Sequence, residues 1–139
     1  MASFTAKVNG VCKRFYAGFT GLLSKRARDI LDGPIQPPTK ANLDRLADET
    51  DALTNELRSL RDHLRPVPAP AAVATRYRRA LDAQEQVLTT FDQATTRLRA
   101  GDLVGFADAL VDRVGASESV MNARFDALGL RACGSQAGK

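Results

Sequence analysis

Leucine recurs every three or four residues between positions 43 and 64, and this repeat constrains the fold more than any other feature. Such spacing places its members on one side of an α-helix, in the pattern of a helix that packs lengthwise against other helices. The members are Leu43, Leu46, Thr50, Leu53, Leu57, Leu60 and Leu64. Because a helix can bury a stripe of this length only against further helices, the sequence predicts a helical bundle.

Three other segments show the same periodicity. They run from about Thr5 to Leu31, from Pro70 to Leu98, and from Leu103 to Leu128. Their stripes contain Phe4, Val8, Cys12, Phe15 and Phe19 in the first, Val73, Tyr77, Leu81, Gln84, Leu88, Phe91, Thr95 and Leu98 in the next, and Leu103, Phe106, Leu110, Val114, Ser117, Met121, Phe125 and Leu128 in the last. No alternating pattern typical of a β-strand is present.

Glycine, proline and capping residues separate the four segments. Gly33-Pro34 ends the first, the proline-rich stretch 66–70 ends the second, and Gly101-Asp102 makes a tight turn before the fourth. Thr39 and Asp102 are suited to cap the helices that follow them. With 139 residues, one core suffices. The sequence therefore predicts an all-α, up-down-up-down four-helix bundle as a single domain over 1–133, with a disordered tail at 134–139.

The two cysteines lie near opposite ends of the sequence. In the predicted topology the start of the first helix and the end of the fourth share a pole, so Cys12 and Cys133 can meet. We expect them to form a disulfide, a bond that persists outside the reducing cytosol. The alternative is a buried Cys12 and an exposed free thiol at Cys133.

Short motifs surround both cysteines: Asn9-Gly10-Val11-Cys12 and Gly129-Leu130-Arg131-Ala132-Cys133. With the proline-broken middle, they resemble actinobacterial exported helical proteins of unassigned activity, which often sit behind a lipoprotein signal or one membrane-spanning helix. The resemblance implies an extracytoplasmic, membrane-tethered protein. The sequence itself has no run of about 18 apolar residues and no secretory signal after Met1, so we expect the tether to lie upstream of it.

Polar residues interrupt the apolar stripes at one height of the predicted bundle. Tyr16, Thr50, Gln84 and Ser117 are expected to lie close together there. Buried polar groups cost about 1–3 kcal/mol each when unpaired, so these groups should bond one another or surround a ligand or water. They form either a layer that fixes the helix register or a small mid-bundle pocket.

Charge is distributed unevenly along the chain. Residues 1–32 hold six basic and two acidic side chains, whereas residues 101–130 hold two basic and five acidic ones, so the two parts attract each other. The basic side chains Lys13, Arg14, Lys25 and Arg28 lie away from the first apolar stripe. They form a solvated face or contact an anionic membrane surface. Nucleic-acid binding is disfavoured because no aromatic residues interleave with them.

Catalytic and metal-binding motifs are absent from the sequence. His63 is the only histidine and lacks partners with zinc-ligand spacing, and no nucleophile triad or phosphate loop is present. We therefore expect a non-enzymatic domain with no cofactor, monomeric or dimeric, that serves as an interaction or scaffold module for an unknown protein partner. The alternative function is a small-molecule carrier or sensor. A scaffold predicts a filled core, whereas a carrier predicts a cavity at mid-height.

Overall fold

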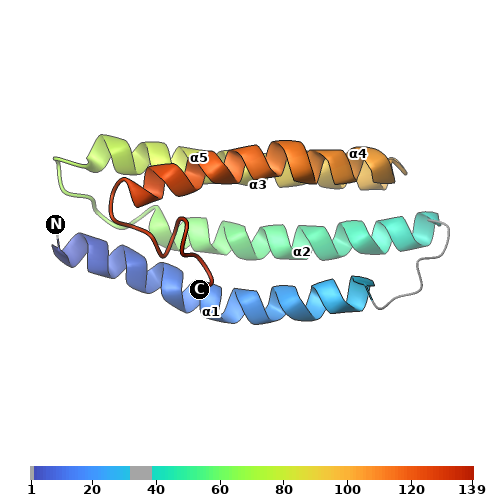
Figure 1. Cartoon of the computed structure of the whole chain (residues 1–139), viewed down its shortest axis with the longest axis horizontal. Coiled ribbons are helices and arrows are strands. Elements are labelled where there is room, and N and C mark those ends of the chain that lie inside the picture. Colours follow the sequence, from blue (N-terminus) through green and yellow to red (C-terminus); the bar gives the residue numbers. More distant parts are fainter. Residues whose placement is uncertain (1, 32–38) are drawn as a thin grey trace.

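The described residues form four helical rods, which run antiparallel to their neighbours (Figure 1). The computed structural model describes residues 2–31 and 39–139, and only the backbone of residues 20–31. The rods are α1 (Ala2–Leu31), α2 (Lys40–Leu64), α3 (Ala74–Arg99) and a fourth rod made of α4 (Leu103–Asp108), the π-helical segment η1 (Ala109–Val114) and α5 (Gly115–Asp126). The predicted all-α four-helix bundle is confirmed.

The helix ends follow from local chemistry. The Thr39 hydroxyl accepts the Asn42 amide at 3.2 Å at the start of α2, and an Asp102 carboxylate oxygen accepts the Gly105 amide at 2.8 Å at the start of α4. Gly101 has φ +82°, a left-handed conformation that suits glycine in the turn before Asp102. Both caps satisfy amide groups that a helix start leaves without partners.

The fourth rod is not a continuous α-helix, contrary to the sequence pattern. The Gly115 amide donates to the Leu110 carbonyl five residues earlier, which is the bond of a π-helix. Ala109 and Val114 are both buried although they are five residues apart. The wider turn thus changes which residues face the core: Leu110 is only half-buried.

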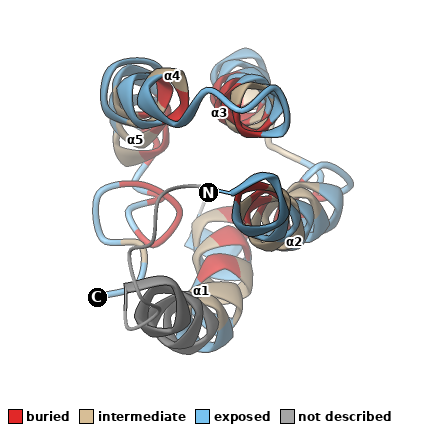
Figure 2. Ribbon diagram, turned by 90° about the vertical axis from the view of Figure 1, so that its right-hand side faces the viewer, coloured by how far each residue is buried: buried red, intermediate tan, exposed pale blue. Residues whose placement is uncertain are grey.

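The rods form an arc in the order α1, α2, α3 and fourth rod (Figure 2). The last residues of the chain, 129–139, which we name the C-terminal segment, lie between α1 and α5 in both views (Figures 1 and 2). Leu130 and Cys133 of this segment are buried. The bundle is therefore closed on this side by a non-helical segment as well as by helices.

Gly134 and Ser135 of the C-terminal segment pack against α5. The sequence predicts a disordered tail at 134–139, whereas here Gly134 is buried and the Ser135 amide donates to an Asp126 carboxylate oxygen at 3.0 Å. A Cβ atom at Gly134 would lie 2.8 Å from the carbonyl oxygen of Asn122. Glycine is needed here because the backbone of the segment lies so near the backbone of α5.

Two hydrophobic clusters occupy the two halves of the bundle. The cluster near the chain termini, the disulfide cluster, includes Phe4, Val8, Cys12, Leu60, Leu64, Tyr77, Phe125, Leu130 and Cys133. The cluster near the α3–α4 turn, the distal cluster, contains Leu43, Ala47, Ala94, Leu98, Phe106 and Ala109. Between them on α2 lie Thr50 and Thr54, so the polar seam positions fall at the junction of the two clusters.

Candidate functional site

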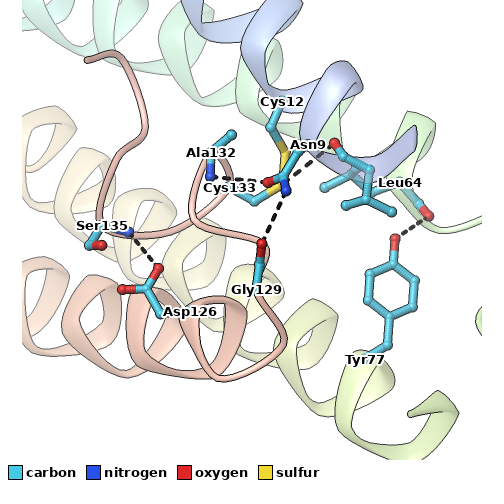
Figure 3. The surroundings of a disulfide bond; sticks show 10 residues. Asn9, Cys12, Leu64, Tyr77, Asp126, Gly129, Ala132, Cys133 and Ser135 are labelled. Carbon is cyan, nitrogen blue, oxygen red and sulfur yellow. Dashed lines mark hydrogen bonds between the residues drawn. A yellow bond between two sulfur atoms is a disulfide. The ribbon is translucent and has the colours of Figure 1, made fainter. Parts of the chain in front are cut away.

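Cys12 and Cys133 form a disulfide that joins α1 to the C-terminal segment (Figure 3). Their Cα atoms are 5.2 Å apart, although the residues are 121 positions apart in the sequence. This confirms the predicted pairing. The bond encloses nearly the whole chain in one covalent loop and fits a compartment more oxidising than the cytosol.

Asn9, one helical turn before Cys12, holds the same segment through its side-chain amide (Figure 3). Its Nδ2 donates to the Gly129 carbonyl oxygen at 3.0 Å, and its Oδ1 accepts the Ala132 amide at 3.1 Å. The two cysteine motifs therefore meet in space. The sequence signal was the Asn-x-x-Cys spacing, which places both side chains on one face of α1.

A cavity of about 310 Å³ lies at mid-height, next to this covalent closure. Helices α1, α2, α3 and α5 and the C-terminal segment all contribute to its walls. Its apolar lining consists of Phe19, Leu53, Leu57, Val87, Leu88, Phe91, Met121 and Ala137, with Gly134 beside them. Its polar lining consists of Tyr16, Thr50, Thr54, Gln84, Glu118, Asn122 and Ser135. A mostly apolar hollow with a few polar groups is the composition of a small-molecule site.

Gln84 carries the unusual feature of this cavity. Its side chain is only 5% exposed, and its Oε1 has no hydrogen-bond partner within the part of the chain that the structure describes. Buried polar atoms are paired in the great majority of protein interiors, since an unpaired one costs about 1–3 kcal/mol. A buried acceptor is thus left unpaired beside the cavity, on the side contributed by α3.

The two threonines from α2 are already bonded to their own helix. Thr50 donates its hydroxyl hydrogen to the Leu46 carbonyl at 2.9 Å, and Thr54 donates to the Thr50 carbonyl at 2.8 Å. Each hydroxyl oxygen keeps lone pairs that can accept, but its single hydrogen is in use. The hydroxyl hydrogens of both threonines are therefore used within α2.

Tyr16 and Glu118 both line the cavity, and the charge of Glu118 acts on the Tyr16 phenol. Burial, and secondly the charge of Glu118, raise the pKa of the Tyr16 phenol to about 12, so the phenol stays neutral at pH 7. Glu118 is an exposed residue, yet partial desolvation of its carboxyl raises its pKa. The rim thus combines a neutral phenol, which can donate, with an acidic group.

The structure brings Tyr16, Thr50 and Gln84 of the predicted set together around the cavity, but Ser117 is not among the lining residues. Its hydroxyl donates to the Arg113 carbonyl at 2.8 Å. The neighbouring Glu118 lines the cavity instead. Between the buried residues Val114 and Met121 the apolar stripe passes near both positions, so sequence spacing alone does not decide which of the two faces inward.

A second hollow, of about 600 Å³, lies on α1 and the C-terminal segment. Its lining includes Lys13, Ala17, Gln136 and Lys139, which are all exposed. The hollow is larger than the cavity, but it is an open surface groove without a buried unpaired group. We therefore take the mid-height cavity as the candidate site.

The basic residues expected to form a membrane-facing surface are described only in part. Lys13 and Arg14 are exposed on α1, whereas the side chains of Lys25 and Arg28 lie outside the described residues. Ion pairs elsewhere join α2 to α3, as between Arg61 and Glu85 at 2.8 Å. Such partly exposed pairs contribute about 0–1 kcal/mol each.

Within the described ranges 2–31 and 39–139, no group of three or more histidine, cysteine or carboxylate residues is arranged to hold a metal ion. No helix in these ranges is long and apolar enough to cross a membrane. Comparison of the chain with family models, with curated proteins and with solved structures gives no match.

Proposed function

We propose that this protein is a non-enzymatic carrier or sensor domain that binds a small apolar molecule in the mid-height cavity. The cavity enclosed by four helices and the C-terminal segment is the observation that favours this function over a scaffold. A scaffold has no need of a hollow core, whereas an unfilled cavity of about 310 Å³ lowers the stability of the ligand-free protein. This loss of stability is offset when a ligand fills the space.

The test is binding of 1-aminoanthracene, a small apolar fluorophore whose emission rises on leaving water. We expect saturable enhancement with the native protein and its loss in Val87→Phe, because Val87 lines the cavity and a phenyl ring there fills part of it. The matched control is Gln86→Phe, which adds the same ring at an exposed position of α3. Enhancement that survives in Val87→Phe but is lost in Gln86→Phe would exclude the cavity as the site.

The proposed location is outside the cytoplasm, on a tether to the cell membrane. The Cys12–Cys133 disulfide supports an oxidising compartment. Protein taken from its own cells and alkylated at once should gain two alkyl groups only after reduction. Two groups added without reductant would contradict the location.

Contact of α1 with anionic lipid is part of the same proposal, supported by the exposure of Lys13 and Arg14. Vesicles containing phosphatidylglycerol should retain the protein at low salt, and phosphatidylcholine vesicles should not. Each basic side chain near an anionic surface contributes about 1 kcal/mol, so Lys13→Glu with Arg14→Glu should release it. Equal retention by both kinds of vesicle would show that binding does not depend on lipid charge.

A protein-interaction role is the second candidate, and the surface of the fourth rod favours it. Val104 and Val111 are 73% and 76% exposed, and Val120 is also exposed. Exposed apolar side chains on one element mark interaction surfaces when they are contiguous. If this role is correct, the double variant Val104→Glu, Val111→Glu should abolish self-association or partner capture while 1-aminoanthracene binding persists.

A further inference from the structure

Glu118 is the only side chain with a charge at pH 7 among the described residues that line the mid-height cavity. No lysine, arginine or histidine belongs to this described lining, although the chain holds 20 lysine and arginine residues. A hollow that carries one carboxylate and no cation attracts positively charged groups and repels anions. The charge of the lining therefore favours a cationic ligand.

The Glu118 carboxylate also lacks a protein partner. It forms no ion pair or hydrogen bond within the part of the chain that the structure describes. Other acidic residues have arginine partners, as Glu85 has in Arg61 at 2.8 Å and Asp51 has in Arg99 at 2.6 Å. Partial burial removes water from the Glu118 carboxyl and raises its pKa. A bound cation would replace that lost hydration.

Three aromatic rings line the same cavity. Tyr16 and Phe19 come from α1, with ring centroids 6.0 Å apart, and Phe91 comes from α3. The charge of Glu118 contributes to the raised pKa of the Tyr16 phenol, so the carboxylate lies within electrostatic reach of one of these rings. Ring faces attract ammonium groups, and sites for quaternary ammonium ligands combine several such rings.

The charged side and the apolar interior of the cavity are distinct. Glu118 is exposed, whereas Val87 and Leu88 line the cavity and are 4% and 2% exposed. A cation beside Glu118 thus keeps part of its hydration, which lowers the desolvation cost of binding it. The apolar part of the same molecule can leave water among the buried side chains.

We infer that the cavity takes a small cationic amphiphile, with an ammonium group beside Glu118 and the Tyr16 ring and an apolar group against Val87 and Leu88. This inference rests on the proposed function, because it names the class of molecule that the proposed site selects. A quaternary ammonium suits the site best, since its methyl groups contact ring faces and it needs no hydrogen-bond acceptor.

The matched probes are benzyltrimethylammonium and neopentylbenzene, which have the same shape and differ by a charged nitrogen in place of a carbon. Their affinities are measured by displacement of 1-aminoanthracene. Glu118→Gln removes the charge at constant size and should weaken binding of the cation about tenfold, while binding of neopentylbenzene is unchanged. Tyr16→Leu should weaken the cation about threefold more than the neutral probe.

Asp112→Asn is the control, because it removes the same charge from an exposed residue of the fourth rod outside the cavity lining. It should leave both affinities unchanged. Phenylmethanesulfonate, an anion of similar size, should bind more weakly than either probe.

A ratio of the two affinities that is unchanged in Glu118→Gln overturns the inference, and so does a ratio that falls equally in Asp112→Asn. Displacement of 1-aminoanthracene by neopentylbenzene but not by benzyltrimethylammonium also overturns it, while leaving the cavity as a binding site. Failure of all three compounds to bind overturns the proposed function as well.

Discussion

The disulfide cluster and the mid-height cavity are adjacent parts of one bundle with opposite packing. In the cluster, Val8, Cys12, Leu64, Phe125 and Leu130 are fully buried against one another. At the cavity, the same helices leave about 310 Å³ unfilled and one polar atom unpaired. The difference indicates that stability is concentrated in the disulfide cluster. The tight packing there offsets the loose packing at the neighbouring cavity.

The C-terminal segment links these two regions physically. Leu130 and Cys133 belong to the disulfide cluster, whereas Gly134, Ser135 and Ala137 line the cavity. One wall of the cavity is thus attached directly to the disulfide. Breaking the disulfide should therefore alter the cavity, whereas filling the cavity should leave the packing of the disulfide cluster intact.

Breaking the disulfide should have the largest effect. Cys12→Ser with Cys133→Ser opens a loop of 121 residues, and the chain entropy regained by the unfolded state lowers the free energy of unfolding by up to about 4–5 kcal/mol. Urea unfolding measures this loss. The variant should also bind 1-aminoanthracene less tightly. A free energy of unfolding equal to that of the oxidised protein would show that the disulfide cluster is stable without the disulfide.

Truncating a leucine should cost more at the pole than at the cavity. Leu64→Ala, at a fully buried residue, creates a new void and should cost about 3–4 kcal/mol. Leu57→Ala, one heptad earlier on α2, only enlarges an existing hollow and should cost about 1–2 kcal/mol. Urea unfolding of the pair gives the difference directly. Equal costs would mean that the cavity region is packed as tightly as the pole.

Asn9→Ala should weaken the non-covalent contact between α1 and the C-terminal segment. It removes two hydrogen bonds to the backbone of the C-terminal segment, with an expected cost of about 2 kcal/mol. Hydrogen exchange of the Ala132 amide should rise as well. The control is Asn55→Ala, whose side chain accepts a bond from Arg58 at an exposed site. Unchanged protection of Ala132 would argue against Asn9 as a clamp.

Gln84→Met should act in the opposite direction on the ligand-free protein. It removes the unpaired buried acceptor and should raise the free energy of unfolding by about 1 kcal/mol. Thr95→Val on the same helix should lower it, since the Thr95 hydroxyl bonds the Phe91 carbonyl at 3.0 Å. Urea unfolding of both variants without ligand is sufficient. If Gln84→Met destabilises the protein, the amide has a structural partner.

Titration of Glu118 should give the smallest effect. Burial raises its pKa above 4.5 in the folded protein, so the folded state holds this proton more tightly than the unfolded chain does. Its contribution to stability is complete below the unfolded pKa and is lost as the pH rises through the folded pKa. Glu118→Gln should remove that decline from a series of urea unfolding curves at acidic pH. Glu56→Gln, at an exposed residue of α2, should retain it.

Much of the fold could be predicted from the sequence because local chemistry decides it. The leucine stripe of α2 and the caps at Thr39 and Asp102 act over one or two helical turns, a range in which spacing is fixed by helix geometry. The meeting of Cys12 and Cys133 followed from helix order alone. Three of the four polar residues predicted to lie together, Tyr16, Thr50 and Gln84, line the cavity, because each occupies a regular position on an uninterrupted helix.

Only the tertiary structure decided the features that depend on contacts between distant segments. The π-helical segment η1 and the choice of Glu118 rather than Ser117 arise where the fourth rod adjusts to its neighbours. The contact of Gly134 and Ser135 with α5 depends on the absence of a side chain at Gly134, where the backbone of the C-terminal segment lies next to the Asn122 carbonyl. Periodicity determines which face of a helix is buried, whereas the space left between several faces, and hence the cavity, is a property of all of them together.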